Sequence, residues 1–284
     1  MKHRTSHKKD RAKPDAAKTT NSRPNRKGSA PRKRGGPSAS NDHVRLYGLH
    51  AVRAALANPA RSFVRLCVTE NALKRLGDIP QTTSLEITIT GPQELDAMVA
   101  PDAVHQGVVL ICAPLSHGDA SELFHLADKK MVLMLDQITD PHNVGAILRS
   151  ASAFGVDAVI VTHRNTAMET GALAKAASGA LDIVPIIEVR NFSKALDELN
   201  DMGFESFGLD SEGPAVLEAA LSAANPERAV LVLGSEGKGL RQQTRETCKH
   251  LARLDMPGEI KSLNVSNAAA LSLYVVRAAI YSSK

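Results

Sequence analysis

Three short segments of this chain combine glycine or proline with small polar residues where an apolar run ends or begins. They span residues 135–151, 231–240 and 256–268. Glycine lets a backbone approach a bound molecule closely and adopt a positive φ, and the polar neighbours add donors and acceptors. Each segment could therefore hold a cofactor or a reacting group.

Each segment also has an ordinary structural explanation. Asn143 could cap a helix that starts near it, with Arg149 as a solvated surface charge. The glycines within 234–239 could form a simple turn, because their spacing matches neither a phosphate loop nor a dinucleotide fingerprint. The third segment could be a helix start capped by Asn264 or Ser266. Taken singly, none of the three assigns a function.

The elements that must position these segments alternate regularly from Met131 onward. Short apolar runs alternate with helical patterns, which predicts a parallel sheet covered by helices on both faces. Ligands bind outside the carboxyl ends of such strands. The alternating segments are Met131–Leu135, Val144–Phe154, Ala158–Val161, Gly171–Ala177, Ile183–Ile187, Phe192–Met202, Glu205–Leu209, Ala215–Ala220, Ala229–Leu233, Gln242–Cys248, Leu251–Leu254 and Asn264–Tyr281.

A smaller α/β pattern precedes this sheet. Between Val44 and Cys112, three helical patterns alternate with three strand patterns. The predicted helices are Gly48–Ala57, Ala72–Leu76 and Gln93–Val99, and the predicted strands are Phe63–Val68, Leu85–Ile89 and Gly107–Cys112. We expect residues 42–113 to form a small domain, 114–130 a linker, and 131–284 the larger α/β domain.

Charge is concentrated in residues 1–41, which contain thirteen Lys or Arg and two Asp. The net charge is therefore +11 there and 22 minus 28, or −6, over the rest of the chain. This segment lacks Val, Leu, Ile, Phe and Tyr, so we expect a disordered tail. Such a tail favours a polyanion partner through counterion release, and a purely solubilising tail is the alternative.

The composition excludes several other classes of protein. No run approaches eighteen apolar residues and the first residues lack the apolar core of a signal peptide, so neither a membrane protein nor a secreted one is expected. The three cysteines, Cys67, Cys112 and Cys248, are widely spaced. This pattern favours a reducing cytoplasm and predicts neither a disulfide framework nor a metal site.

In their order, residues and spacing, the three segments resemble motifs one, two and three of the SpoU, or TrmH-like, branch of the SPOUT methyltransferases. The resemblance runs from Met131 to the C-terminus. It implies transfer of a methyl group from S-adenosylmethionine to a ribose 2′-hydroxyl of RNA. Tyr47–Val52 and His105–Val108 resemble, more weakly, the substrate-binding domain attached to the ribosomal RNA guanosine methyltransferases of this family.

The resemblance also implies roles for individual residues. A deep trefoil knot in the larger domain and an active site formed across a homodimer are implied as well. Lys175, Ser178 and Gly179 could line the substrate side, while His105 and Arg53 could contact RNA. The implied catalytic residues are Asn143, Arg149, Glu236, Ser262 and Asn264, and the implied cofactor-binding residues are Gly234, Ser235, Leu254, Met256 and Leu263.

Two roles for Arg149 are open. The family proposal makes the motif-one arginine the base that accepts the proton of the 2′-hydroxyl. An arginine side chain is almost always charged, which makes it a demanding base, so it could instead pair with a substrate phosphate and orient the ribose.

The sequence therefore predicts a cytoplasmic, homodimeric RNA ribose 2′-O-methyltransferase that acts on a guanosine of 23S rRNA. Neither DNA nor a membrane is an expected partner. A tRNA methyltransferase of the same branch is one alternative. A non-catalytic RNA-binding assembly protein that keeps the fold is another.

Overall fold

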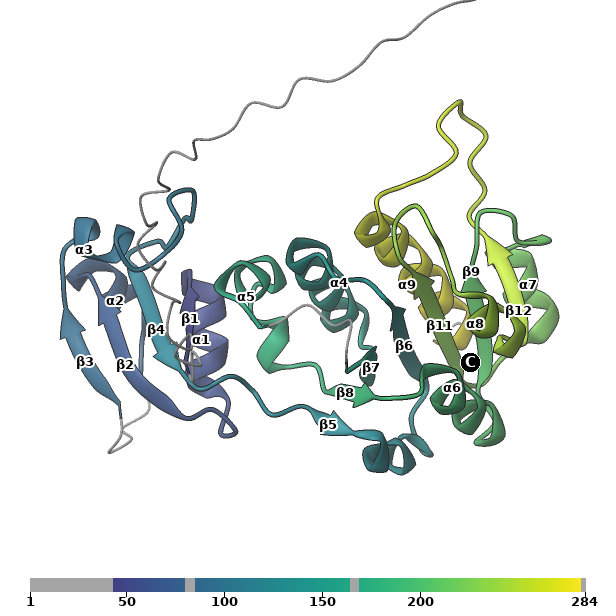
Figure 1. The fold of residues 1–284 in the computed structure, drawn as a ribbon, viewed down its shortest axis with the longest axis horizontal. Helices are drawn as coiled ribbons and strands as arrows, with labels where there is room; N and C mark the ends of the chain where they lie inside the picture. The colour runs from purple at the N-terminus through teal and green to yellow at the C-terminus, as the bar shows by residue number, and fades with distance from the viewer. Residues whose placement is uncertain (1–42, 80–84, 164–168, 282–284) are drawn as a thin grey trace, which may run out of the picture. The chain divides into compact units, whose positions relative to one another are not determined.

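The computed structural model describes residues 43–79, 85–163 and 169–281 (Figure 1). The basic tail over residues 1–41 lies outside the described residues, so its predicted disorder stays a prediction. The described chain contains a four-stranded sheet and an eight-stranded sheet. None of its helices is long and apolar enough to span a membrane.

The four-stranded sheet lies within residues 43–112, the part of the chain that the sequence predicts as a small domain. Its strand order is β1-β4-β2-β3, with β4 antiparallel to both neighbours and β2 parallel to β3. The strand β1 was not predicted, because four residues with one arginine give too short a pattern. The elements are β1 (Val44–Tyr47), α1 (Leu49–Ala57), β2 (Phe63–Val68), α2 (Glu70–Leu76), β3 (Glu86–Ile89), α3 (Pro92–Asp96) and β4 (Val108–Cys112).

The eight-stranded sheet has the order β10-β12-β9-β11-β6-β7-β8-β5, and every one of its strand pairs is parallel. The predicted parallel α/β architecture is therefore confirmed. Its strands are β5 (Gly118–Asp119), β6 (Met131–Asp136), β7 (Ala158–Thr162), β8 (Ile186–Val189), β9 (Glu205–Leu209), β10 (Ala215–Val216), β11 (Ala229–Gly234) and β12 (His250–Arg253).

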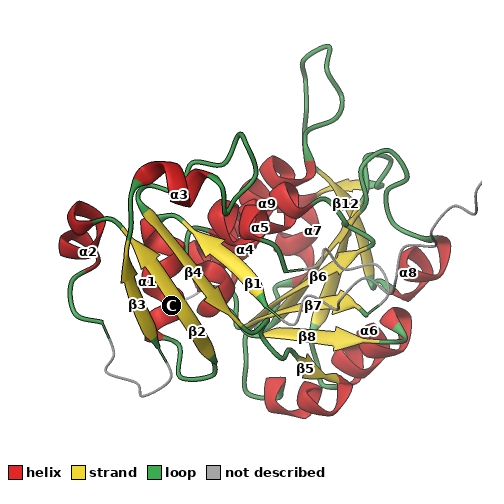
Figure 2. Cartoon of the chain, turned by 60° about the vertical axis from the view of Figure 1, so that its left-hand side comes forward, coloured by secondary structure: helices red, strands yellow, loops and turns green. Residues whose placement is uncertain are grey.

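Helices cover both faces of this sheet (Figure 2). Alternate residues of the central strands face opposite sides, so Leu133 and Leu231 join one apolar cluster while Met134 and Val232 join the other. The helices on the first face are α4 (Pro141–Phe154), α5 (Gly171–Ala177), α7 (Leu217–Ala224) and α9 (Val265–Tyr281), with the short 3-10 helix η2 (Ala180–Asp182). On the second face lies α6 (Phe192–Asp201), which contacts α8 (Gln242–Thr247) and the 3-10 helix η1 (Ala120–Leu126).

Some predicted boundaries were wrong. The strand expected at 183–187 lies at 186–189, because η2 occupies the preceding residues. The expected linker, 114–130, contains β5 and η1, and β5 pairs with β8. A two-residue strand is too short to produce a detectable period. The helix α4 begins two residues before Asn143, since Pro141 suits the first turn and Asp140 caps it.

Candidate functional site

The first two sequence segments meet because β6 and β11 are neighbours in the sheet. The last residues of these two strands, Asp136 and Gly234, are paired in register. The chain leaves β6 toward α4 and leaves β11 through a turn at 235–240. The start of α9 lies beside both, since its first residue contacts the side chain of Glu236.

Three side chains at this edge form a closed hydrogen-bond cluster. The Oε1 atom of Glu236 accepts from Nδ2 of Asn143 at 3.0 Å, from Nδ2 of Asn264 at 2.9 Å and from the backbone N of Val265 at 3.3 Å. Nδ2 of Asn264 also donates to Oδ1 of Asn143 at 3.0 Å. One carboxylate thus fixes the orientation of two amides. Asn143 is buried and, contrary to the capping interpretation, does not cap α4.

Asn264 has a second, structural role. Its Oδ1 atom accepts from the backbone N of Ser266 at 2.9 Å and from the Ser266 hydroxyl at 2.5 Å, which caps the start of α9. Its Nδ2 atom meanwhile belongs to the cluster with Glu236 and Asn143. The same side chain therefore begins a helix and helps to build the cluster.

A pocket of about 280 Å³ borders this cluster. Its wall combines backbone from the turn after β11 with apolar side chains such as Leu209 and Leu233. All five residues that the family resemblance implies for the cofactor line it, together with two of the implied catalytic residues. These lining residues are Gly234, Ser235, Leu254, Met256 and Leu263, with Glu236 and Ser262.

Asp136, at the end of β6, holds the far end of the turn that carries Glu236. The Asp136 carboxylate is fully buried and accepts from Nε of Arg241 at 2.6 Å, from the backbone N of Arg241 at 3.2 Å and from Oγ1 of Thr244 at 2.7 Å. These bonds tie the end of β6 to the start of α8, where the turn finishes. This role of Asp136 was not predicted, although an acidic residue at the end of an apolar strand is a signal that the sequence contains.

Arg149 stands apart from the cluster. It lies six residues after Asn143 on α4, which rotates its side chain by about 240° around the helix. Its side chain is exposed, as predicted from the buried stripe of α4, and makes no hydrogen bond or ion pair with any described residue. Its donors are available to another molecule.

Other residues expected near RNA have protein partners. Nζ of Lys175 on α5 donates to Oε1 of Gln106 in the small domain at 2.9 Å, and burial lowers the pKa of this amine. The guanidinium of Arg53 donates to carbonyl oxygens at the end of α2. The ring of His105 lies 3.0 Å from Asp96. Ser178 ends α5 in the left-handed conformation, with Gly179 next to it.

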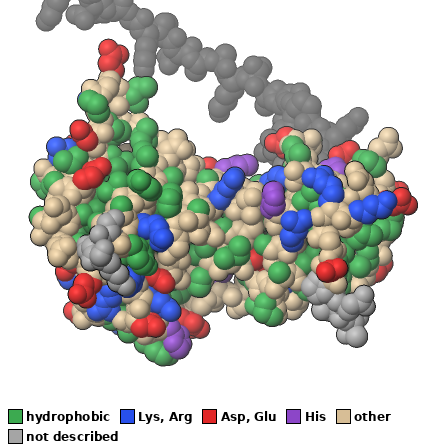
Figure 3. Space-filling view, turned by 180° about the vertical axis from the view of Figure 1, so that it is seen from behind, with side chains coloured by type: hydrophobic (Ala, Val, Ile, Leu, Met, Phe, Trp, Pro, Cys, Tyr) green, Lys and Arg blue, Asp and Glu red, His purple; other side chains and the backbone are tan. Residues whose placement is uncertain are grey.

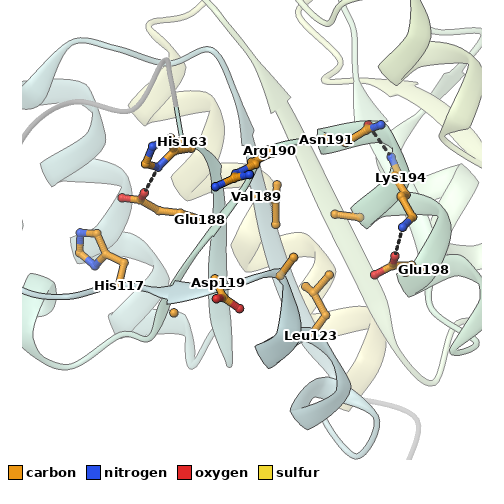
Figure 4. A pocket seen from close by; sticks show the side chains of 13 residues that line it. His117, Asp119, Leu123, His163, Glu188, Val189, Arg190, Asn191, Lys194 and Glu198 are labelled. Atoms are coloured by element: carbon orange, nitrogen blue, oxygen red, sulfur yellow. Dashed lines mark hydrogen bonds and ion pairs between the residues drawn. The ribbon is translucent and has the colours of Figure 1, made fainter.

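A larger pocket, of about 540 Å³, lies between β5, β8 and α6 (Figure 4). Its polar side chains are partly engaged with one another, since His163 lies 2.8 Å from Glu188 and Lys194 lies 3.5 Å from Glu198. None of the implied site residues lines it. Over the described ranges, no group of His, Cys, Asp or Glu is arranged to hold a metal ion.

Comparisons with known protein families match both parts of the chain. A model described as the SpoU rRNA Methylase family matches residues 130–274. A second model, described as RNA 2′-O ribose methyltransferase substrate binding, matches residues 45–118.

Individual relatives match over most of the chain. The 23S rRNA (guanosine-2′-O-)-methyltransferase RlmB of Haemophilus ducreyi is 37% identical over 81% of this chain and 96% of its own length. The enzyme of the same name from Coxiella burnetii is 35% identical over 82% of this chain and 94% of its own.

Among solved structures, the SpoU methyltransferase AviRb from Streptomyces viridochromogenes, in complex with the cofactor AdoMet, shares the fold. It aligns with a TM-score of 0.68 at 21% identity, over 83% of this chain and 89% of its own. A protein from Porphyromonas gingivalis, described as "a putative RNA methyltransferase of the TrmH family", aligns with a TM-score of 0.63 at 23% identity, over 83% of this chain and 90% of its own.

Proposed function

The chain belongs to the SpoU rRNA methylase family, and we propose that it transfers a methyl group from S-adenosylmethionine to the ribose 2′-hydroxyl of a guanosine in 23S rRNA. The observation that carries the proposal is the cluster of Asn143, Glu236 and Asn264 at the edge of the pocket. The names of relatives at 35–37% identity supply the substrate. A tRNA substrate is the alternative within the family.

The pocket beside the cluster suits S-adenosylmethionine in its chemistry. Its wall offers backbone groups of Gly234–Gly239 to polar edges of a ligand and the side chains of Leu254 and Leu263 to an apolar face. We assign cofactor binding to Gly234, Ser235, Leu254, Met256 and Leu263. The cofactor supplies an electrophilic methyl group, and the chain must hold the acceptor oxygen in line with it.

Positioning is the main contribution that these residues make to the reaction. Alignment of the two reactants contributes roughly 7–11 kcal/mol in favourable cases. Glu236 fixes both amides of the cluster, so Asn143 and Asn264 present preset polar groups to the ribose. Ser262 adds a hydroxyl at the pocket wall. Arg149, which has no hydrogen-bond partner among the described residues, pairs with a substrate phosphate or accepts the proton.

We further propose that the protein is a cytoplasmic homodimer with the family's trefoil knot, paired through the exposed side of α9. Leu271 is 52% exposed and Tyr274 63% exposed on this helix, and Tyr274 packs edge-on against Phe154 of α4. Large exposed apolar side chains that adjoin one another favour burial against a partner. Because α9 starts at Val265, next to Asn264, a partner on this helix would lie close to the site.

Two basic regions support RNA as the substrate. Exposed arginine and lysine side chains lie on α1 and α2 of the small domain, and Figure 3 shows several such side chains over that domain, at the right. Residues 1–41 add a charge of +11. Deleting the tail should weaken RNA binding and flatten its salt dependence, while an unchanged slope of log affinity against log salt would exclude phosphate contacts by the tail.

The decisive experiment is methylation by the purified full-length chain. It would be incubated with radiolabelled S-adenosylmethionine and either 23S rRNA or tRNA, and the modified nucleotide would be mapped. We expect a 2′-O-methylated guanosine in 23S rRNA. Label in tRNA alone would favour the alternative enzyme. RNA binding without cofactor binding or label would favour a non-catalytic assembly protein.

A further inference from the structure

We propose that Arg61 fixes the orientation of the small domain on the methyltransferase domain, and thereby positions the RNA substrate for methyl transfer. The proposal rests on the proposed function for its link to RNA. Its structural basis is a group of three charged residues, Arg61, Glu169 and Asp182, which we term the junction cluster. Arg61 lies in the loop between α1 and β2, whereas both carboxylates belong to the methyltransferase domain.

The junction cluster uses the guanidinium of Arg61 almost completely. Its Nε donates to Oδ1 of Asp182 at 2.7 Å and its Nη2 to Oδ2 at 3.2 Å, which forms a two-pronged pair. Its Nη1 donates to Oε1 of Glu169 at 2.5 Å and to the carbonyl of Ala113 at 3.2 Å. Two parallel bonds to one carboxylate define direction as well as distance.

Further bonds extend the junction cluster along the chain between the domains. Oε2 of Glu169 accepts from the backbone N of Leu115 at 2.7 Å. Nδ2 of Asn58 donates to Oδ1 of Asp182 at 3.0 Å. The two carboxylates therefore hold the end of α1, the loop before β2 and the chain that leaves β4.

The three charged side chains of the junction cluster are buried, so each must be paired with good hydrogen-bond geometry. The side chains of Arg61, Glu169 and Asp182 are 0%, 5% and 2% exposed. Burial by itself lowers the pKa of Arg61, but its bonds to Asp182 and the charges of Glu169 and Asp182 outweigh this and raise it, so it stays charged. A buried ion pair contributes little net affinity, because desolvation offsets the attraction. Its use here is to select one orientation, in which four hydrogen bonds to oxygen satisfy almost all of the guanidinium's donors.

A continuous set of packed elements links the junction cluster to the reaction site. Glu169 immediately precedes the cap of α5, and α5 packs directly on α4, which carries Asn143. The contact is so close that a Cβ added at Gly145 would lie 2.5 Å from the carbonyl oxygen of Leu173. The bond between Lys175 and Gln106 provides a second tie between α5 and the small domain.

The test compares two variants with the wild-type full-length chain. Arg61→Met removes the cation and leaves two buried carboxylates, so it could fail to fold. The triple variant Arg61→Met/Glu169→Gln/Asp182→Asn removes all three charges together and avoids that cost. Arg228→Met is the matched control, because among the described residues Arg228 donates to carbonyls of Ala127 and Met202, both inside the methyltransferase domain.

Two measurements distinguish positioning from mere stabilisation. Spin labels at Lys74→Cys on α2 and Lys194→Cys on α6 would report the distance distribution between the domains, which we expect to be narrow in the wild type and broad in the triple variant. Steady-state methylation should show kcat/KM for RNA lowered about tenfold or more, since small misplacements of a substrate are costly. The dissociation constant for S-adenosylmethionine should not change.

A triple variant that folds, keeps a narrow distribution and retains wild-type kcat/KM would overturn the proposal. A broad distribution with unchanged kcat/KM would overturn the positioning role. A loss of kcat/KM equally large in Arg228→Met would show that general destabilisation is responsible. If the wild type proves not to methylate RNA, the proposed function fails, while the label distances still report whether Arg61 fixes the domain.

Discussion

Arg61 and Arg149 occupy opposite environments in the same chain. Arg61 is buried between two domains, and its guanidinium is bound to two carboxylates and a carbonyl. Arg149 is exposed on α4 and makes no hydrogen bond or ion pair with the described residues. Near the start of the same helix, Asn143 belongs to a cluster with Glu236 and Asn264 that contains one carboxylate and two neutral amides.

The comparison shows that an arginine can serve structure when its donors are bound inside the protein, or chemistry when they are exposed. A buried guanidinium must be fully paired, because an unsatisfied charge in the interior is costly. An exposed guanidinium can keep its donors for a phosphate or a reacting hydroxyl. Substitution at Arg149 should therefore lower the rate with little effect on stability, whereas substitution at Arg61 should lower both the stability of the chain and kcat/KM for RNA.

The largest expected effect is on the rate of the Arg149→Ala variant. Loss of a group that orients the ribose or moves its proton should lower the single-turnover rate by about 10²–10⁴-fold. Because the side chain is exposed and has no partner within the described part of the chain, the unfolding free energy should change by less than about 0.5 kcal/mol. Single-turnover methylation and urea unfolding measure the two quantities. A rate within a few-fold of wild type would remove Arg149 from the proposed mechanism.

Arg149→Lys separates the two proposed roles in part. Lysine keeps the charge but loses the planar fork. A pH–rate profile of single-turnover methylation compares it with the wild type. If the Lys variant shows no new ionisation, the assignment of Arg149 as the base loses support, and phosphate pairing is favoured.

The second effect concerns the stability of the junction cluster. Arg61→Met should lower the unfolding free energy by about 3–5 kcal/mol, since it leaves Glu169 and Asp182 buried without their cation. The triple variant that also neutralises both carboxylates should recover most of this loss. Urea unfolding followed by circular dichroism measures both. If the single and triple variants were equally stable, the loss in Arg61→Met would not come from leaving two buried carboxylates without their cation.

A smaller effect is expected for Glu236→Gln at the reaction site. The variant keeps the shape and one acceptor oxygen but loses the charge that strengthens three hydrogen bonds. We expect kcat to fall by about 10- to 100-fold with a stability change near 1 kcal/mol. Glu246→Gln on the exposed side of α8 is the matched control and should keep full activity. Full activity in both variants would show that the charge of Glu236 is dispensable.

The two regions also differ in how well the sequence predicts them. The parallel sheet follows from short apolar strands that alternate with helices, and family resemblance pointed to Asn143, Glu236 and Asn264. Simple periodicity could not show that Glu236 accepts from both amides, because its partners lie 93 and 28 residues away. Their roles in catalysis stay predictions. Spatial convergence of strand ends explains why such residues meet, but not which atoms bond.

The junction cluster was not predicted at all. Arg61 follows a Pro-Ala turn and resembles an ordinary surface charge, and its acidic partners come 108 and 121 residues later. Ion pairs between domains leave no local period, since they depend on how two independently patterned units dock. A similar reason explains β5, whose two residues are a strand only because they pair with β8.

The smallest expected effect is a pH dependence of stability near the junction cluster. His117 lies in the chain between the two sheets, and burial lowers the pKa of its ring. The charges of Glu188 and Glu169 oppose this shift, while that of Arg61 adds to it. The pKa of His117 in the folded chain is thus below its ordinary value of 6.5, and the neutral ring is favoured in the folded chain.

The sign of the pH effect follows from proton binding. Above pH 6.5 the ring is neutral in both states, so its full contribution is present. As the pH falls below that value, the unfolded chain binds a proton that the folded chain resists, and stability decreases until the folded pKa has been passed. His117→Asn should therefore show a shallower loss of unfolding free energy between about pH 7 and pH 5. Parallel urea titrations of both proteins measure the difference, in which other titrating groups cancel. Identical slopes would show that His117 titrates alike in both states. A shallower slope would show that half-buried His117, which feels the charge of Arg61, contributes to stability through its environment, as exposed Arg149 does not.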